Sequence, residues 1–169
     1  PFIHNCSIIC ENTDSFSAAV KLSSLAGQYY HVRKDPMEVL VLNFANPFNP
    51  GGGVRRGAEA QEEDLCRKSS LLLSLESDSA KAYYNYHRQL RSPYSSDAII
   101  LSSKVQIIKD ANQKLLPSPV TVAVLTCAAP MLQNGLHNLT QEQYHSLMAR
   151  RIDGILSVAA HLGYRVLVL

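Results

Sequence analysis

Residues 39–64 read VLVLNFANPFNPGGGVRRGAEAQEED, and the rest of the chain is organised around this stretch. The apolar, β-branched run 39–42 predicts a buried strand, which ends at the Asn and Pro residues of 46–50. The glycines 51–53 have no Cβ, so the backbone can adopt positive φ and a ligand can approach main-chain N–H groups. Gln61-Glu62-Glu63-Asp64 then opens a predicted helix, because a helix N-terminus favours acidic side chains. The stretch therefore predicts a strand, a glycine loop and an acidic helix start in succession.

The two adjacent glutamates are the candidates for chemistry. Neighbouring residues on a helix point about 100° apart, so Glu62 and Glu63 are expected to have different roles. Glycosidases usually use two facing carboxyl groups about 5 to 9.5 Å apart, and this motif supplies no obvious second one. One glutamate could serve first as acid and then as base. A purely structural interpretation is that both glutamates stabilise the helix N-terminus by their charge, which is worth up to about 1 kcal/mol. The glycine loop at a fixed distance from the glutamates favours a functional site over this interpretation.

Composition excludes several function classes. A net charge of +2, from 16 basic and 14 acidic residues, gives no broad basic surface, so direct binding to DNA or RNA has no support. No apolar run approaches the about eighteen residues of a membrane span, and no signal segment opens the chain. We expect a cytoplasmic protein without a membrane partner. Its 169 residues, 46% of them hydrophobic, suffice for one domain with a sizeable core.

The cysteines and histidines do not predict a metal site. Cys6 and Cys10 are close in sequence, but Cys66 and Cys127 supply no second close pair for a tetrahedral zinc site. We interpret the four as buried free thiols, which suits a reducing compartment. His87 has no partner at ligand spacing and is interpreted as structural. We therefore expect neither metal nor organic cofactor.

Strands and helices alternate along the chain, which predicts an α/β sandwich with a largely parallel sheet. Segment 28–36 is interpreted as a loop. The tyrosines at 83, 84 and 86 could stack on bases, but at helical spacing Tyr83 and Tyr86 are more often packing residues. The predicted strands cover residues 7–10, 98–101, 105–108, 120–125 and 165–169, and the predicted helices run through 15–27, 80–90 and 141–162, the last with Thr140 as N-cap and Gly163 as C-cap.

The glycine loop resembles the signature of the microbial poly(ADP-ribose) glycohydrolase family: three glycines, a spacer of six to eight residues, then Gln-Glu-Glu. The spacer here is the seven residues 54–60, so the pattern is complete. Similarity continues through 43–46, 64–70, 126–130 and 162–169, which covers nearly the whole chain. The resemblance implies a macrodomain-like α/β fold, a three-layer α/β/α sandwich with a mixed, largely parallel sheet.

The resemblance also implies roles for site residues. Glu63 would be the catalytic acid/base, Glu62 would hold ribose hydroxyls beside the scissile bond, and Gln61 would orient the pair. Asn46 would fix the distal ribose through its amide. An acid working near neutral pH would need a raised pKa, which burial or a neighbouring carboxylate could supply.

Two further contacts follow from the same resemblance. Gly51, Gly52 and Gly53 would bring main-chain donors against ribose and phosphate, and Glu11 would meet the adenine amino group. An exposed turn carboxylate is an equally weighted interpretation of Glu11. The chain departs from the family's usual wording at Cys127, at Met131 and around 102–106, which affects the expected pocket wall more than the chemistry.

The function implied is hydrolysis of the ribose–ribose linkage of poly(ADP-ribose), with poly(ADP-ribosyl)ated proteins as partners. Two alternatives stay open: an ADP-ribose-binding module without turnover, or a hydrolase of another ADP-ribosyl linkage. The chain has no initiator Met and stops within an apolar strand, so both ends are expected to be cut. We expect one macrodomain-like catalytic domain over 1–169, incomplete, with a second, diphosphate-binding loop after residue 169.

Overall fold

The computed structural model describes residues 6–29, 39–132 and 138–169. Four strands form one sheet in the order β2-β3-β1-β4. In this sheet β1 runs parallel to both β3 and β4, whereas β2 and β3 form an antiparallel hairpin, so the mixed, largely parallel sheet is confirmed. The strands are β1 (Val39–Phe44), β2 (Ile100–Lys109), β3 (Leu115–Cys127) and β4 (Val166–Val168).

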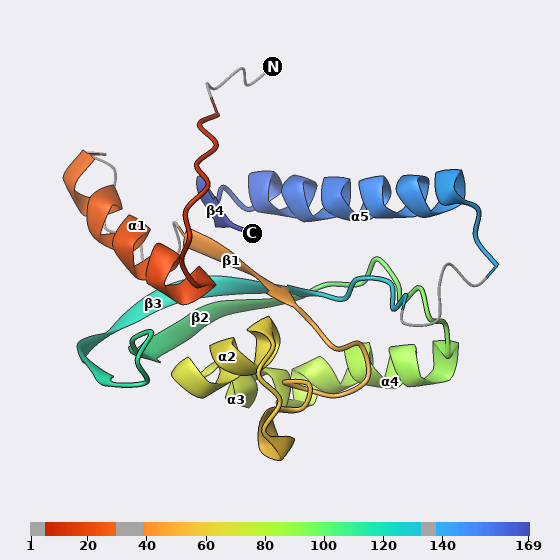
Figure 1. Ribbon diagram of the computed structural model, residues 1–169, viewed down its shortest axis with the longest axis horizontal. Helices are drawn as coiled ribbons and strands as arrows, with labels where there is room; N and C mark the ends of the chain where they lie inside the picture. The colour runs from red at the N-terminus through yellow and green to blue at the C-terminus, as the bar shows by residue number, and fades with distance from the viewer. Residues whose placement is uncertain (1–5, 30–38, 133–137) are drawn as a thin grey trace.

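Helices cover both faces of the sheet, and Figure 1 shows α5 above it and α2, α3 and α4 below it. The helices are α1 (Ser15–Tyr29), α2 (Gln61–Lys68), α3 (Leu71–Leu75), α4 (Lys81–Leu90) and α5 (Gln141–His161), with short 3-10 turns η1 (Val54–Arg56) and η2 (Asp78–Ala80). Successive strand residues point to opposite faces, so the apolar run of β1 feeds two cores. Val39 and Val41 pack with α1 to α4, whereas Leu40 and Leu42 pack with α5. This confirms the three-layer α/β/α sandwich.

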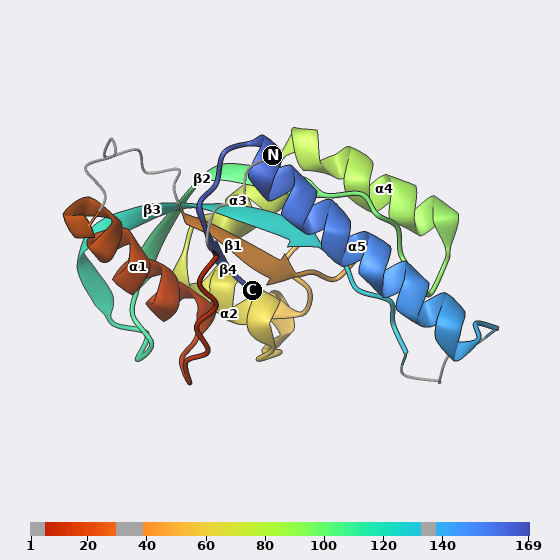
Figure 2. The same cartoon turned by 90° about the horizontal axis from the view of Figure 1, so that it is seen from above.

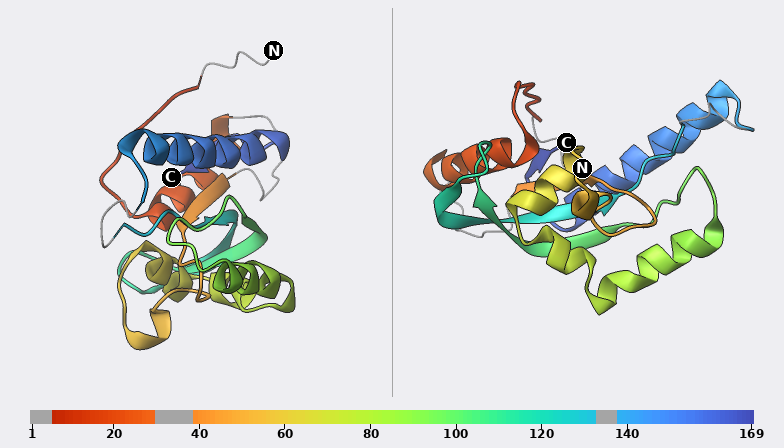
Figure 3. Two further views of the ribbon diagram at one scale, coloured as in Figure 1. Left: turned by 90° about the vertical axis from the view of Figure 1, so that its right-hand side faces the viewer. Right: turned by 60° about the horizontal axis from the view of Figure 1, so that its bottom comes forward.

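The carboxyl ends of β1 and β3 meet at one edge of the sheet. Ala45 donates its backbone N–H to the carbonyl of Cys127, so the two strands leave the sheet side by side. Seen from above, α5 runs on past this edge (Figure 2), and α4 and α5 extend on opposite sides of it (Figure 3). Ligands of open α/β sheets bind beyond the carboxyl ends of the strands, so this edge is where a site is expected.

Three strand predictions were wrong in extent. Residues 7–10 are exposed and form no strand, because no neighbouring strand pairs with them in the described part of the chain. Residues 100–101 and 105–108 belong to one strand, β2, and residues 98–99 precede it. The register of β2 shifts between Ser102 and Val105, so the polar residues there form an irregularity rather than a turn. The strand predicted over 120–125 begins earlier, because β3 already includes Pro117 and Pro119. Since β1 pairs with β3 only from Ala123 on, neither proline needs a backbone N–H for pairing with β1.

The sequence predicted the helix ends more accurately than the helix faces that are buried. Asp14 accepts from the N–H groups of Phe16 and Ser17 at the start of α1, which continues to Tyr29, and residues 30–36 of the predicted loop lie outside the described residues. The capping box of Thr140 and Gln143 is present at α5, and Gly163 adopts φ +78° after its end. The apolar residues of α5 recur every three or four positions, a pattern that predicts a stripe facing the core. However, Ile152, Leu156 and Leu162 of this stripe are 45–49% exposed, because α5 meets the sheet along a narrower line through Ile155 and Ala159.

Candidate active site

Glu62 and Glu63 lie in the first turn of α2 and are both buried, with exposed fractions of 3% and 7%. Glu62 accepts the backbone N–H of Asn46 on Oε2 at 2.7 Å and the side-chain amide of Asn43 on Oε1 at 3.3 Å, and the backbone of Gly51 also hydrogen-bonds to it. Glu63 receives the N–H of Gly53 on Oε1 at 2.7 Å, while its buried Oε2 has no hydrogen-bond partner among the described residues. The two carboxylates therefore take different partners, as the helix geometry predicts.

Burial raises the pKa of Glu62 to about 7. Loss of solvent contact is the largest cause, and the neighbouring charge of Glu63 adds to it, whereas the donors Asn46 and Asn43 act in the opposite direction. Glu62 is therefore partly protonated near neutral pH. The catalytic acid, assigned to Glu63 by the resemblance, is expected to need a raised pKa, with Glu62 as the neighbouring carboxylate; in the structure the raised pKa is that of Glu62.

The glycine loop is built around these carboxylates. Gly51 and Gly52 adopt φ of +67° and +59°, which L side chains rarely adopt. A Cβ on Gly52 would overlap Glu63 Oε1 and lie 3.0 Å from Glu62 Oε2, and one on Gly51 would lie 2.6 Å from Leu72 Cδ1. The absence of side chains at these two positions thus lets the loop backbone pass directly over both carboxylates.

The N–H groups of this loop are largely used within the protein. Gly52 donates to the carbonyl of Asn49 at 3.0 Å, and Gly53 donates to Glu63. These bonds fix the loop and orient Glu63. The contacts of Gly51, Gly52 and Gly53 with ribose and phosphate, which the resemblance implies, stay a prediction.

Gln61 connects the start of α2 to the sheet. Its side-chain Nε2 donates to the carbonyl of Leu42 at 2.7 Å, and its Oε1 accepts the N–H of Phe44 at 2.9 Å. A third contact reaches Ser15 Oγ at 3.3 Å. Gln61 therefore anchors the helix that carries both glutamates, and the role predicted for it in orienting them toward a substrate stays a prediction.

Asn46 shapes the turn after β1. Its Oδ1 accepts the N–H groups of Phe48 and Asn49, both at 2.9 Å, in an Asx-type turn. Its backbone N–H holds Glu62. Only its Nδ2 is left for a ligand, so the predicted contact of Asn46 with a ribose would have to use this donor.

Glu11 lies four residues before α1, whose first residue contacts Gln61. Its carboxylate pairs with Lys21 at 2.6 Å, and both side chains are about half exposed. The predicted contact with adenine stays a prediction.

Sequence reasoning missed the buried polar pair behind Glu62. Asn43 and Thr126 are fully buried and lie opposite each other in the paired ends of β1 and β3. The Asn43 amide donates to Thr126 Oγ1 at 3.2 Å as well as to Glu62, and its own Oδ1 has no partner in the described part of the protein. A polar residue closing each of two apolar strands is the sequence signal that could have revealed them.

The other candidate side chains are structural. His87 is 1% exposed and contacts the Tyr83 carbonyl and Ser96 Oγ, which confirms its structural role. Tyr83 is buried as predicted, whereas Tyr86 is half exposed. Of the cysteines, only Cys66 and Cys127 are buried; Cys6 and Cys10 are exposed, and all four are free. Within the described ranges, no cluster of three or more His, Cys, Asp or Glu could hold a metal ion, and no helix is long and apolar enough to cross a membrane.

Comparison with known proteins identifies this arrangement. The model of the microbial-type PARG catalytic domain matches residues 4–110. The chain belongs to the microbial-type poly(ADP-ribose) glycohydrolase family. The match includes the glycine loop, Gln61 and both glutamates, whereas Thr126 and the end of β3 lie beyond the matched residues.

Solved structures of bacterial glycohydrolases share the fold. The enzyme from Thermomonospora curvata, bound to the inhibitor ADP-HPD, is 35% identical with a TM-score of 0.81; the match covers 90% of this chain and 54% of that one. A point mutant of the Deinococcus radiodurans enzyme with ADP-ribose is 35% identical, with a TM-score of 0.80 and coverages of 93% and 59%. The chain thus spans little more than half the length of these relatives. No curated protein matches the sequence at a significant level.

Proposed function

We propose that the protein hydrolyses ribose–ribose O-glycosidic bonds of poly(ADP-ribose) and releases ADP-ribose, with Glu63 as general acid and base. The observation that carries this proposal is the buried Glu63 carboxylate, with one oxygen bound by the glycine loop and the other unpartnered. The T. curvata relative binds the inhibitor ADP-HPD and the D. radiodurans relative binds ADP-ribose, which supports ADP-ribose as the ligand of this chain.

Glu63 is the better candidate for the chemistry because of its free oxygen. Glu62 already accepts from Asn43 and Asn46 through its two oxygens, whereas Glu63 Oε2 has no protein partner in the described chain and is available to a glycosidic oxygen. As acid, Glu63 would protonate the departing ribose oxygen while the anomeric carbon passes through an oxocarbenium-like state. The same carboxylate would then accept a proton from the attacking water.

The remaining residues would hold the substrate around this carboxylate. Glu62 would accept hydrogen bonds from ribose hydroxyls, and Asn46 Nδ2 would donate to the distal ribose. Gly52, which lacks a side chain, would let the sugar approach the carboxylates closely. Glu11 would meet the adenine amino group, and the proteins that carry the polymer would be the partners.

The test follows ADP-ribose released from poly(ADP-ribose) by the full-length protein, by its Glu63→Gln variant and by a matched Glu59→Gln control. Glu59 is an exposed carboxylate on the same loop, so its replacement changes charge without touching the site. We expect Glu63→Gln to lower kcat by about 100-fold or more, the usual contribution of general acid–base catalysis, and Glu59→Gln to leave it nearly unchanged.

Calorimetric titration with ADP-ribose separates binding from turnover. ADP-ribose binding without release by the unmodified protein would refute the proposal and leave an ADP-ribose-binding module. Release from protein-linked single ADP-ribose, but not from the polymer, would point to a hydrolase of another ADP-ribosyl linkage. Release that survives in Glu63→Gln would remove the assigned role of Glu63.

A further inference from the structure

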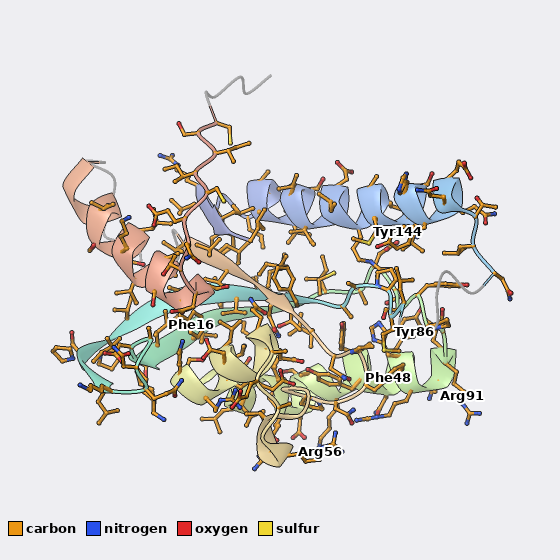
Figure 4. The ribbon with its side chains drawn as sticks, viewed as in Figure 1. Phe16, Phe48, Arg56, Tyr86, Arg91 and Tyr144 are labelled. Carbon is orange, nitrogen blue, oxygen red and sulfur yellow. The ribbon has the colours of Figure 1, made fainter. Side chains whose placement is uncertain are left out.

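The spacer between the glycines and Gln61 carries two adjacent arginines. The family pattern specifies only the length of this spacer, not which residues occupy it. Arg55 and Arg56 form η1, the 3-10 turn at the tip of this loop, and both are exposed. Figure 4 shows Arg56 at the tip of the loop, on the side away from the sheet. This places a cation on the rim of the site, outside the crevice at the strand ends.

The two arginines have different environments. Arg55 forms a bidentate pair with the Glu76 carboxylate, through contacts of 2.7 to 3.2 Å, which ties the loop to the end of α3. The Arg56 side chain has no ion pair or hydrogen bond to any residue that the structure describes. Arg55 therefore fixes the loop, and Arg56 is left as an uncompensated charge.

Arg56 is rigidly connected to the catalytic carboxylate. Its backbone N–H donates to the carbonyl of Gly53 at 2.8 Å, and the N–H of that glycine donates to Glu63. On the far side of the loop, Arg67 Nη1 binds the carbonyl of Ala58 at 2.6 Å. Arg56 is therefore three residues from the glycine that holds Glu63, and the hydrogen bonds of this turn fix its backbone relative to that carboxylate.

The acidic side chains around the loop do not neutralise Arg56. Glu76 is used by Arg55, and Asp64 is paired with Lys68 at 2.7 Å. The exposed Glu59 directly follows Ala58, whose carbonyl binds the Arg67 guanidinium. One free positive charge on the rim of a carboxylate-lined site would offset the repulsion between those carboxylates and a polyanionic substrate.

We propose that Arg56 binds the diphosphate of the leaving part of the poly(ADP-ribose) chain, immediately beyond the scissile bond. This rests on the proposed glycohydrolase function. In the polymer, the leaving ribose, whose oxygen departs from the anomeric carbon with a proton from Glu63, carries a diphosphate at its other end, one sugar away from the cut. A guanidinium binds phosphate oxygens through paired N–H donors. Arg56 would thus select for a polymeric substrate over an ADP-ribose unit attached to a neutral group.

The experiment compares two substrates of the full-length protein: length-fractionated poly(ADP-ribose), and ADP-ribose carrying a neutral aryl leaving group at the same anomeric carbon. Arg56→Gln is measured beside Arg91→Gln, which removes the same charge from the far end of α4 (Figure 4). Arg91 is exposed and makes no side-chain bond to a described residue. Both variants keep Glu63 and the glycines intact.

We expect Arg56→Gln to raise KM for the polymer by about three- to tenfold at 50 mM salt, with the difference shrinking at 300 mM because salt screens exposed charges. KM for the aryl substrate and kcat for both substrates should stay within about twofold. Arg91→Gln should match the unmodified protein on both substrates.

Three outcomes would overturn the proposal. If the unmodified protein cleaves both substrates and Arg56→Gln leaves KM for the polymer unchanged, Arg56 has no such role while the proposed function stands. An equal rise of KM in Arg91→Gln would mean diffuse attraction rather than a site. If the unmodified protein cleaves neither substrate, the proposed function itself fails, and this inference with it.

Discussion

Replacing Gly52 or Gly57 by alanine separates backbone strain from disturbance of the carboxylates. Both glycines have positive φ, +59° and +81°, so a side chain at either position costs about 1–2 kcal/mol of unfolding free energy. A Cβ on Gly57 meets nothing within 4 Å. A Cβ on Gly52 overlaps Glu63 Oε1, so that oxygen must withdraw by most of an ångström.

The two substitutions should therefore differ in activity far more than in stability. A misplacement of about 1 Å at a catalytic group can cost about 100-fold in rate, so we expect Gly52→Ala to lower kcat for ADP-ribose release by about that factor. Gly57→Ala should stay within about threefold. Urea unfolding of both variants measures the strain, and initial rates on poly(ADP-ribose) measure the chemistry. Equal kcat values for Gly52→Ala and Gly57→Ala would refute the close packing of the loop over Glu63.

Two further predictions concern stability. Because the pKa of Glu62 is raised from 4.5 to about 7 on folding, the native state binds more protons than the unfolded chain in that window, and the unfolding free energy falls as pH rises from about 4.5 to 7. Urea unfolding at pH 5 and pH 8 should show that Glu62→Gln removes up to about 3 kcal/mol of this fall; an unchanged pH dependence would contradict the buried-carboxylate explanation. Arg151 is 4% exposed and donates to the carbonyls of Ala128 and Tyr94 and to Asp97. Arg151→Ala should therefore lower the unfolding free energy by about 2–4 kcal/mol. Arg150→Ala breaks only an exposed pair with the same Asp97 and should lower it by less than about 1 kcal/mol. Similar losses of unfolding free energy in both variants would contradict the structural role assigned to the buried Arg151.

Sequence reasoning succeeded where the signal is local. The strand 39–42, the glycine loop and the start of α2 all lie within residues 39–64, and the capping box at Thr140 is complete within four residues. In these segments the turn chemistry, the apolar pattern and the helix ends all specify the same structure. The family resemblance rests on the same segments.

Sequence reasoning failed where the answer depends on residues far apart. Whether residues 7–10 form a strand depends on a partner strand, and the apolar run itself carries no information about that partner. The pairing of Asn43 with Thr126 joins positions 83 residues apart, and it becomes visible only through the parallel register of β1 and β3. The exposed apolar side of α5 is a similar case, since periodicity fixes a stripe but not how much of it a sheet covers.

The role of Gln61 shows how these two kinds of information combine at the site. On β1, the register with β4 ends at Val41 and Val168, which leaves the next backbone groups of β1 open on that side. The Gln61 amide fills this position: it donates to the Leu42 carbonyl and accepts from the Phe44 N–H, as a peptide unit of a neighbouring strand would. The helix that follows therefore starts at a fixed point on the strand edge. Because Glu62 and Glu63 are the next two residues, one carboxylate meets the turn after β1 and the other meets the glycine loop. A glutamine directly before the two glutamates is thus a requirement of the sheet edge as much as of the chemistry.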